Sequence, residues 1–241
     1  MNLRKYGAIL IVVASLCAAL ASSAAAEVAE TGKSQWYISG KALAVGSGKS
    51  VNCVIGEHNA EKKVVLTTTV GKVALKLTAT GIACPGGEIE EEEPNGVKMA
   101  VAQATSITFT GVSVSEPANC STSAKLITEP LEAFVQMEKG SATKAFVKFA
   151  PKNGSLFIKI PITGENCAIA NPEYEIKGTV YGEAVNPTGT GATEQPVTFS
   201  EAIQNTAGGA LTFGSKPAQL TGRAIFTNLN GANESFSAKE V

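Results

Sequence analysis

Apolar and polar side chains alternate along several stretches of this chain, which is typical of strands that bury one face of a sheet. The clearest alternation covers residues 73–79, 156–162 and 174–180. In the last of these, Tyr174 and Ile176 alternate with glutamate, lysine and threonine side chains. We therefore predict strands at these positions, each with one buried and one solvent-facing side.

Residues that favour turns separate these stretches. Pro151-Lys152-Asn153-Gly154 lies between two apolar stretches and predicts a hairpin. Helical periodicity is scarce, and only residues 199–205, with Ser200 as the N-cap, predict a short helix. Many short strands joined by frequent turns predict an all-β protein: an antiparallel β-sandwich or barrel-like body with short hairpins and little helix.

A segment rich in Gly, Thr and Pro, residues 187–195, interrupts the strand pattern and predicts a flexible connection. It follows a region, residues 27–186, that we interpret as a β-sandwich domain. The remaining residues, 196–241, are few for an independent domain. We expect them to return as additional strands packed on the same body.

The N-terminus, residues 1–26, has the features of a secretory signal peptide: basic residues, a short apolar run and then small residues. Ala24-Ala25-Ala26 provides the cleavage signal, so Glu27 is the expected first residue of the mature chain. A lipid anchor on Cys17 is the alternative, but Leu16 stands where a small residue is needed. No later stretch is apolar for long enough to span a membrane. The sequence thus predicts a secreted or cell-envelope protein.

Four cysteines remain after the signal peptide is removed, and an even number in an exported chain predicts two disulfides. Three connectivities are possible. We favour Cys53–Cys84 with Cys120–Cys167, because these bridges close loops within consecutive stretches of chain. The alternatives are free buried thiols or a metal site, but close cysteine pairs and nearby histidines are missing. We expect no metal and no cofactor.

All 21 acidic residues are glutamate, and His58 is the only histidine. Aspartate and histidine supply most metal ligands, general bases and the orienting groups of catalytic triads. The mature chain has 18 Lys and Arg against 21 Glu, and its only arginine is Arg223. This near-neutral balance argues against nucleic acid as a partner. The composition therefore favours a protein that is not an enzyme.

Glu173 and Glu175 are the best catalytic candidates, although weak ones. They lie on the same face of a predicted strand, about 7 Å apart by strand rise, a spacing compatible with glycoside hydrolysis by paired carboxylates. Lys177 continues the same face, as expected for a strand that faces solvent.

Two further motifs have structural explanations. Gly48-Lys49-Ser50 matches the end of a nucleotide-binding P-loop, but the preceding glycine and a following helix are missing, so we predict a turn and no bound nucleotide. Residues 88–93, Glu-Ile-Glu-Glu-Glu-Glu, form the only charge run. We predict a solvated loop there, with a weak calcium site as the alternative.

Trp36 and Tyr37 are the only adjacent aromatic residues, and Trp36 is the only tryptophan. Exported β-modules bind sugars by stacking them on such rings, since an aromatic side chain has a flat apolar face and a polar edge. The alternative is that Trp36 packs in the core at the start of the first strand. We keep both residues as candidate binding residues.

The chain also resembles a family of uncharacterised exported β-rich proteins that soil actinobacteria carry in many copies. The similar residues are Trp36-Tyr37 and Gly40, Ile82-Ala83-Cys84, Phe109-Thr110-Gly111, Phe149-Ala150-Pro151 with Gly154 and Phe157, Gly164 with Cys167-Ala168-Ile169, Gly178, and the stretch from Ala210 to Phe236. In that family a cysteine commonly follows the glycine placed like Gly111, whereas here it is Val112, and Cys53 is an additional cysteine. The resemblance implies export and a β architecture, and it implies no activity.

These observations lead to two functional hypotheses. The first is an exported non-catalytic β-protein of the cell surface or extracellular space, which binds an extracellular polymer or protein or has a structural role. The second is a β-sandwich enzyme active on carbohydrates through Glu173 and Glu175. The absence of aspartate and the near-absence of histidine favour the first.

Overall fold

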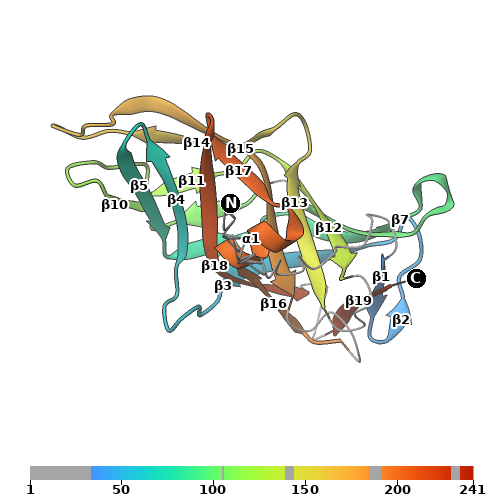
Figure 1. Cartoon of the computed structure of the whole chain (residues 1–241). Helices are drawn as coiled ribbons and strands as arrows, with labels where there is room; N and C mark the ends of the chain where they lie inside the picture. The colour runs from blue at the N-terminus through green and yellow to red at the C-terminus, as the bar shows by residue number, and fades with distance from the viewer. Residues whose placement is uncertain (1–33, 105, 139–143, 185–190, 229–233, 241) are drawn as a thin grey trace, which may run out of the picture.

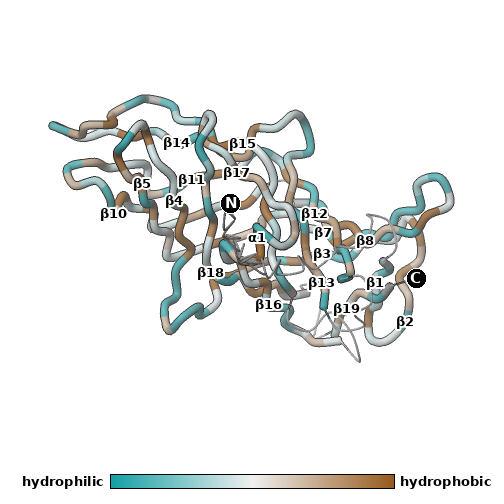
Figure 2. The backbone as a smooth tube through the Cα atoms, viewed as in Figure 1, coloured by the Kyte–Doolittle hydropathy of each residue, from teal (hydrophilic) through white to brown (hydrophobic). Residues whose placement is uncertain are grey.

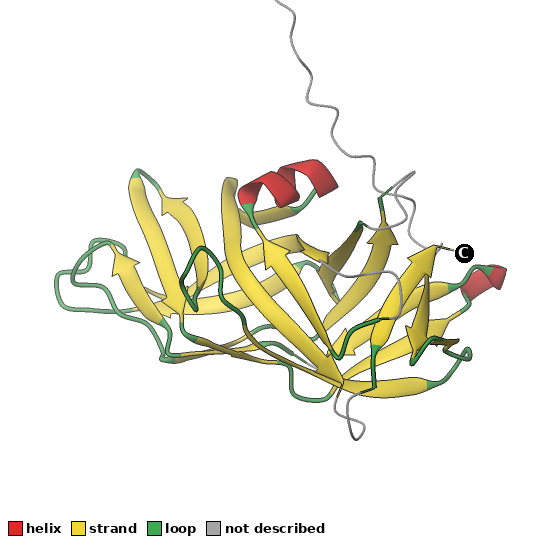
Figure 3. Cartoon of the chain, turned by 90° about the horizontal axis from the view of Figure 1, so that it is seen from below, coloured by secondary structure: helices red, strands yellow, loops and turns green. Residues whose placement is uncertain are grey.

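The structure is a computed structural model that describes residues 34–104, 106–138, 144–184, 191–228 and 234–240. The predicted signal peptide and residues 187–190 of the predicted flexible segment lie outside these ranges. The described chain contains nineteen strands, one α-helix and one 3-10 turn, so the all-β prediction is confirmed (Figure 3).

Eight antiparallel strands close into a barrel. Their order around it is β18, β16, β15, β13, β12, β8, β7 and β3, and β3 pairs again with β18. The strands are β3 (Gly48–Ile55), β7 (Gly87–Glu92), β8 (Met99–Ala104), β12 (Leu131–Met137), β13 (Ala145–Pro151), β15 (Asn171–Ala184), β16 (Glu194–Phe199) and β18 (Lys216–Asn228). Closure leaves this part of the molecule without free sheet edges.

The two longest strands, β15 and β18, extend beyond the barrel into a second sheet, which lies at the opposite end of the molecule from the termini of the described chain (Figure 1). The order of this sheet is β10, β5, β4, β18, β17, β15, β14. The added strands are β4 (Val64–Val70), β5 (Val73–Ala79), β10 (Ser113–Glu116), β14 (Leu156–Ile162) and β17 (Ala210–Phe213). The fold is therefore a barrel and a sheet that share two strands.

A three-stranded sheet packs with the second sheet, and one core cluster runs through both and into the barrel. Its strands are β6 (Gly81–Ala83), β9 (Thr108–Thr110) and β11 (Lys125–Ile127). The disulfides are Cys53–Cys84 and Cys120–Cys167, as we favoured. Cys53 belongs to barrel strand β3 and Cys84 follows β6, so this bridge joins the barrel to the three-stranded sheet.

The predicted alternation is present in the strands. In β5, Leu75 and Leu77 are buried while Ala74 is exposed, and β15 buries Ile176 between the outward-facing Glu175 and Lys177. Hydropathy changes repeatedly along these strands for the same reason (Figure 2). Period-two patterning therefore predicted both the strands and their faces.

The hairpin predicted at residues 151–154 is wrong. Strands β13 and β14 flank this turn but do not pair with each other, because both pair with β15. β13 pairs with residues 180–184 of β15, and β14 pairs with residues 171–177. The Gly178 N–H donates to the Ser155 carbonyl at 2.8 Å across the interruption. The turn at residues 151–154 therefore connects two strands, β13 and β14, that run in the same direction and pair with successive parts of β15.

The short helix was predicted correctly. Helix α1 (Glu201–Ala207) begins at Ser200, whose side chain accepts a hydrogen bond from the Ile203 N–H. The Gln204 side chain accepts from the Tyr181 N–H at 2.8 Å and donates to the Tyr181 carbonyl. Tyr181 lies between the part of β15 that pairs with β17 and the part that pairs with β16. Gln204 therefore forms hydrogen bonds with the N–H and the carbonyl of Tyr181, which pair with neither β16 nor β17.

The segments after residue 195 complete the barrel. β16 and β18 are two of its eight strands, and β16 begins at Glu194, inside the segment predicted to be flexible. Within residues 196–241, β17 and β18 pair with strands of the barrel and of the second sheet. The described strands within residues 27–186 do not close into a barrel by themselves, because β16 and β18 lie between β15 and β3.

Candidate ligand cavity of the barrel

A second three-stranded sheet, distinct from the one formed by β6, β9 and β11, covers one end of the barrel. We call it the cap sheet. It consists of β1 (Ser34–Ile38), β2 (Lys41–Ala42) and β19 (Phe236–Glu240), in the order β19, β1, β2. β1 and β19 come from the two ends of the described chain and pair along their whole length (Figure 1). Alternation in these strands directs Trp36, Phe236 and Ala238 toward the barrel, where all three are buried.

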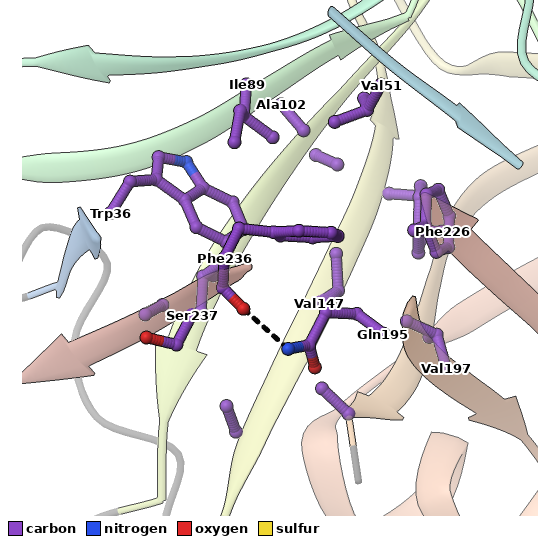
Figure 4. Close-up of a pocket in the computed structure, with 16 residues that line it drawn as sticks. Trp36, Val51, Ile89, Ala102, Val147, Gln195, Val197, Phe226, Phe236 and Ser237 are labelled. Carbon is purple, nitrogen blue, oxygen red and sulfur yellow. Dashed lines mark hydrogen bonds between the residues drawn. The ribbon is translucent and has the colours of Figure 1, made fainter. Parts of the chain in front are cut away.

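A cavity of about 60 Å³ lies between the cap sheet and the interior of the barrel (Figure 4). Its lining residues come from all eight barrel strands and from the cap sheet: Trp36, Val51, Ile89, Ala102, Ala133, Val135, Ala145, Val147, Phe149, Ala184, Gln195, Val197, Phe226, Phe236, Ser237 and Ala238. Five of these are alanines, and none has an ionisable side chain. An eight-stranded barrel is just wide enough to be filled by side chains or to hold one small ligand. Here small side chains leave part of the interior empty.

Gln195 and Ser237 are the polar side chains among the lining residues, and Gln195 is the one with an amide group (Figure 4). It is 6% exposed, and its Nε2 donates to the Phe236 carbonyl at 2.6 Å. Its Oε1 is buried and has no hydrogen-bond partner. A buried acceptor without a partner costs free energy, so Oε1 is an acceptor that the capped molecule leaves unused.

Hydrogen bonds from side chains hold the cap sheet on the barrel. The Trp36 indole N–H donates to the Val101 carbonyl at 2.9 Å, and the Ser34 hydroxyl donates to the Val135 carbonyl at 2.8 Å. The backbone N–H of Trp36 donates to Glu91 Oε2 at 2.8 Å. The strands of the cap sheet form no ladder with the barrel strands. The cap sheet is therefore attached by side-chain contacts and apolar burial, together with one bridge between Ala192 and Phe236.

Glu91 shows that the predicted solvated loop at residues 88–93 is wrong. These residues belong to β7, in which Ile89 and Glu91 point inward and Glu88 points to solvent. Glu91 is 0% exposed, and its Oε1 has no partner. Burial raises the pKa of Glu91, against the opposing effects of the Trp36 N–H and the charge of Lys98. Buried and exposed positions alternate along β7, but four of its six residues are glutamate, so no alternation of apolar and polar residues indicated a strand there.

Glu173 and Glu175 lie in the part of β15 that belongs to the second sheet, away from the cavity. Glu173 forms an ion pair with Lys159, with 2.6 Å between the charged atoms, and Glu175 forms one with Lys177 at 2.7 Å. The hydrogen bond and charge of Lys177 lower the pKa of Glu175. A lowered pKa suits a carboxylate that stays ionised and does not suit a general acid.

The two aromatic candidates point in opposite directions. Trp36 is 7% exposed and lines the cavity, whereas Tyr37 lies on the other face of β1 with Lys239 Nζ 4.5 Å from its ring centroid. The two rings therefore do not form a joint stacking surface. Of the two, only Trp36 is among the residues that line the cavity.

The other motifs have structural positions. Gly48-Lys49-Ser50 begins strand β3 and does not form the predicted turn. His58 forms an isolated bridge with Glu61. In the described part of the chain, no group of three or more His, Cys, Asp or Glu side chains is arranged to hold a metal ion.

The fold and the cavity define a capped eight-stranded antiparallel barrel with an apolar cavity inside it. Comparison with protein-family models, with curated proteins and with solved structures found no match. Within the described ranges, no helix has the length and apolar character needed to cross a membrane.

Proposed function

We propose that this protein is exported, is not an enzyme, and acts outside the cell as a binding module that holds a small apolar ligand inside its barrel. The observation that carries the proposal is the apolar cavity beneath the cap sheet. Small-molecule sites are concave, mostly apolar, and contain a few placed polar groups. The cavity surface is apolar, and Gln195 is the amide side chain among its lining residues.

Export is supported by the sequence of residues 1–26 and by the two disulfides. Disulfides form and persist in oxidising compartments such as the cell exterior. If the chain is exported as proposed, the released protein begins at Glu27. N-terminal sequencing of secreted protein tests this, and a chain that keeps residues 1–26 contradicts it.

The absence of catalysis is supported by the nature of the cavity. Its lining offers no group that exchanges protons near neutral pH. The alternative, a carbohydrate-active enzyme using Glu173 and Glu175, gains no support from their positions, since each is paired with a lysine on an outward-facing strand.

Ligand binding requires the cap sheet to move. The cavity of about 60 Å³ is smaller than the roughly 150 Å³ cavity that accepts benzene in an engineered protein. A ring-sized ligand must therefore displace a side chain of the cap sheet, and Trp36 and Phe236 are the large ones at the cavity. Since Trp36 is the only tryptophan, its fluorescence reports this displacement.

Titration of the disulfide-bonded mature protein with toluene tests the proposal. We expect saturable binding by calorimetry together with a change in Trp36 fluorescence. Ala133→Leu fills the cavity and should weaken toluene binding at least tenfold, whereas Ala74→Leu on the exposed face of β5 should leave it unchanged. Equal toluene binding by both variants would show that the ligand does not enter the barrel.

A further inference from the structure

We infer that the ligand is a small uncharged aromatic compound whose polar group both donates and accepts hydrogen bonds, as an amide does, and that it takes the place of Phe236. This inference rests on the proposed function and adds the class of ligand. The side chains that occupy and line the barrel in the capped molecule provide the argument.

Phe236 occupies the barrel as an aromatic ligand would. The residue is 2% exposed, and its ring centroid lies 6.3 Å from that of Trp36. The ring also lies next to the empty part of the cavity (Figure 4). Removing Phe236 would join its volume to the existing space. A ring of similar size would then find the apolar contacts that Phe236 leaves.

Gln195 determines the polar part of the ligand. In the capped molecule its Nε2 binds the Phe236 carbonyl, while its Oε1 has no partner. When β19 moves so that the backbone carbonyl of Phe236 withdraws together with its side chain, the amide of Gln195 offers both a donor and an acceptor. A ligand with a carbonyl oxygen and an N–H on neighbouring atoms matches both, and it also satisfies the oxygen that is unpaired in the capped molecule.

The charge of the ligand follows from what the cavity lacks. Neither lysine nor arginine lines it, so a buried carboxylate ligand would have no cationic partner. Burying an unpaired charge is far more costly than burying a hydrogen-bonded amide. Glu91, the buried carboxyl that accepts a hydrogen bond from the Trp36 N–H, adds no positive charge beneath the cap sheet. The site therefore selects a neutral compound.

The experiment compares three ligands of nearly the same shape: benzamide, benzoate and toluene. Each is titrated into the disulfide-bonded mature protein by calorimetry, with Trp36 fluorescence as a second readout. We expect benzamide to bind at least tenfold more tightly than benzoate and severalfold more tightly than toluene, because only benzamide satisfies Gln195 without bringing a charge.

Two variants separate the polar and apolar contributions. Gln195→Leu should reduce benzamide affinity to that of toluene and leave toluene binding in place. Phe236→Ala should strengthen binding of both compounds about tenfold, because the side chain that competes with them is gone. Gln103→Leu is the matched control, since Gln103 lies on the outer side of β8 next to Glu90 and Lys152. It should change none of these affinities.

The outcomes distinguish this inference from the proposed function. Toluene binding that is blocked by Ala133→Leu, but with benzamide no tighter than toluene or benzoate, overturns the ligand class and leaves the barrel as the binding site. If neither the wild type nor Phe236→Ala binds any of the three, both proposals fail. Should Gln195→Leu not fold, as judged by near-UV circular dichroism, the comparison of the three ligands on wild-type protein still decides the ligand class.

Discussion

At the scale of single residues, Glu91 is a fully buried carboxyl with one unpaired oxygen. Its Oε2 accepts a hydrogen bond from the Trp36 N–H, so it also contributes to holding the cap sheet. The charged groups that act on it are Lys98, which favours the ionised form, and Glu93, which opposes it. Desolvation dominates these effects and raises the pKa of Glu91.

This raised pKa predicts a particular dependence of stability on pH. Between the unfolded-state pKa near 4.5 and the higher folded-state pKa, the folded protein binds more protons at Glu91 than the unfolded chain does. The contribution of Glu91 to the free energy of unfolding therefore falls as pH rises through this window. Glu91→Gln removes the contribution, so the variant should gain stability relative to the wild type as pH rises, and the two should converge in acid.

Urea unfolding at a series of pH values measures this difference. Glu88→Gln, on the solvent-facing side of the same strand, is the matched control and should give a profile parallel to that of the wild type. If Glu91→Gln also gives a parallel profile, or loses stability as pH rises, the desolvated carboxyl does not have the role assigned to it.

At the scale of the elements, the strands and their faces could be predicted from the sequence, whereas their pairing could not. The alternation of apolar and polar residues that predicts β5, β14 and β15 is local: it depends only on which side of each strand is buried. Pairing depends on distant segments, and β15 is long enough to pair with β13 and β14 in succession. For this reason an apparently clear turn at residues 151–154 proved not to be a hairpin.

The candidate site was partly predictable for the same reason. Trp36 was identified because it is the only tryptophan, although its position inside the barrel depends on pairing between β1 and β19, some 200 residues apart in the chain. No local pattern marks Gln195, which reads as one polar residue in an ordinary strand. Its role arises only when β19 brings the Phe236 carbonyl to it.

Helix α1 provides a prediction at this scale. Gln204 satisfies both backbone groups of Tyr181 in the gap between β16 and β17. Gln204→Leu keeps the apolar part of the side chain but leaves a buried N–H and a buried carbonyl unpaired, so we expect a loss of roughly 2–4 kcal/mol in the free energy of unfolding. Asn205→Leu, the same substitution at an exposed position of the helix, should change stability by less than about 0.5 kcal/mol. Chemical denaturation measures both, and equal losses would show that Gln204 does not satisfy this gap.

For the whole molecule, the disulfides connect parts that the sheets alone leave separate. Cys53–Cys84 joins the barrel to the three-stranded sheet, while Cys120–Cys167 joins the loop before β11 to the loop before β15. The bridges close loops of 31 and 47 residues. By loop-closure entropy each bridge stabilises the fold by about 4 kcal/mol, so loop length does not distinguish the contributions of the two bridges to stability.

Burial does distinguish them. Cys53 and Cys84 are both buried in the shared core, whereas Cys120 and Cys167 are partly exposed. We therefore expect increasing concentrations of dithiothreitol to reduce Cys120–Cys167 while the fold persists, because a reductant reaches partly exposed sulfur without unfolding. Reduction of Cys53–Cys84 should coincide with global unfolding, since attack on a buried bridge requires the core to open. Thiol labelling with mass spectrometry, followed alongside the near-UV circular dichroism, measures the order. If Cys53–Cys84 is reduced first, or if both bridges are reduced together before unfolding, the barrel and the three-stranded sheet separate more readily than their common core implies.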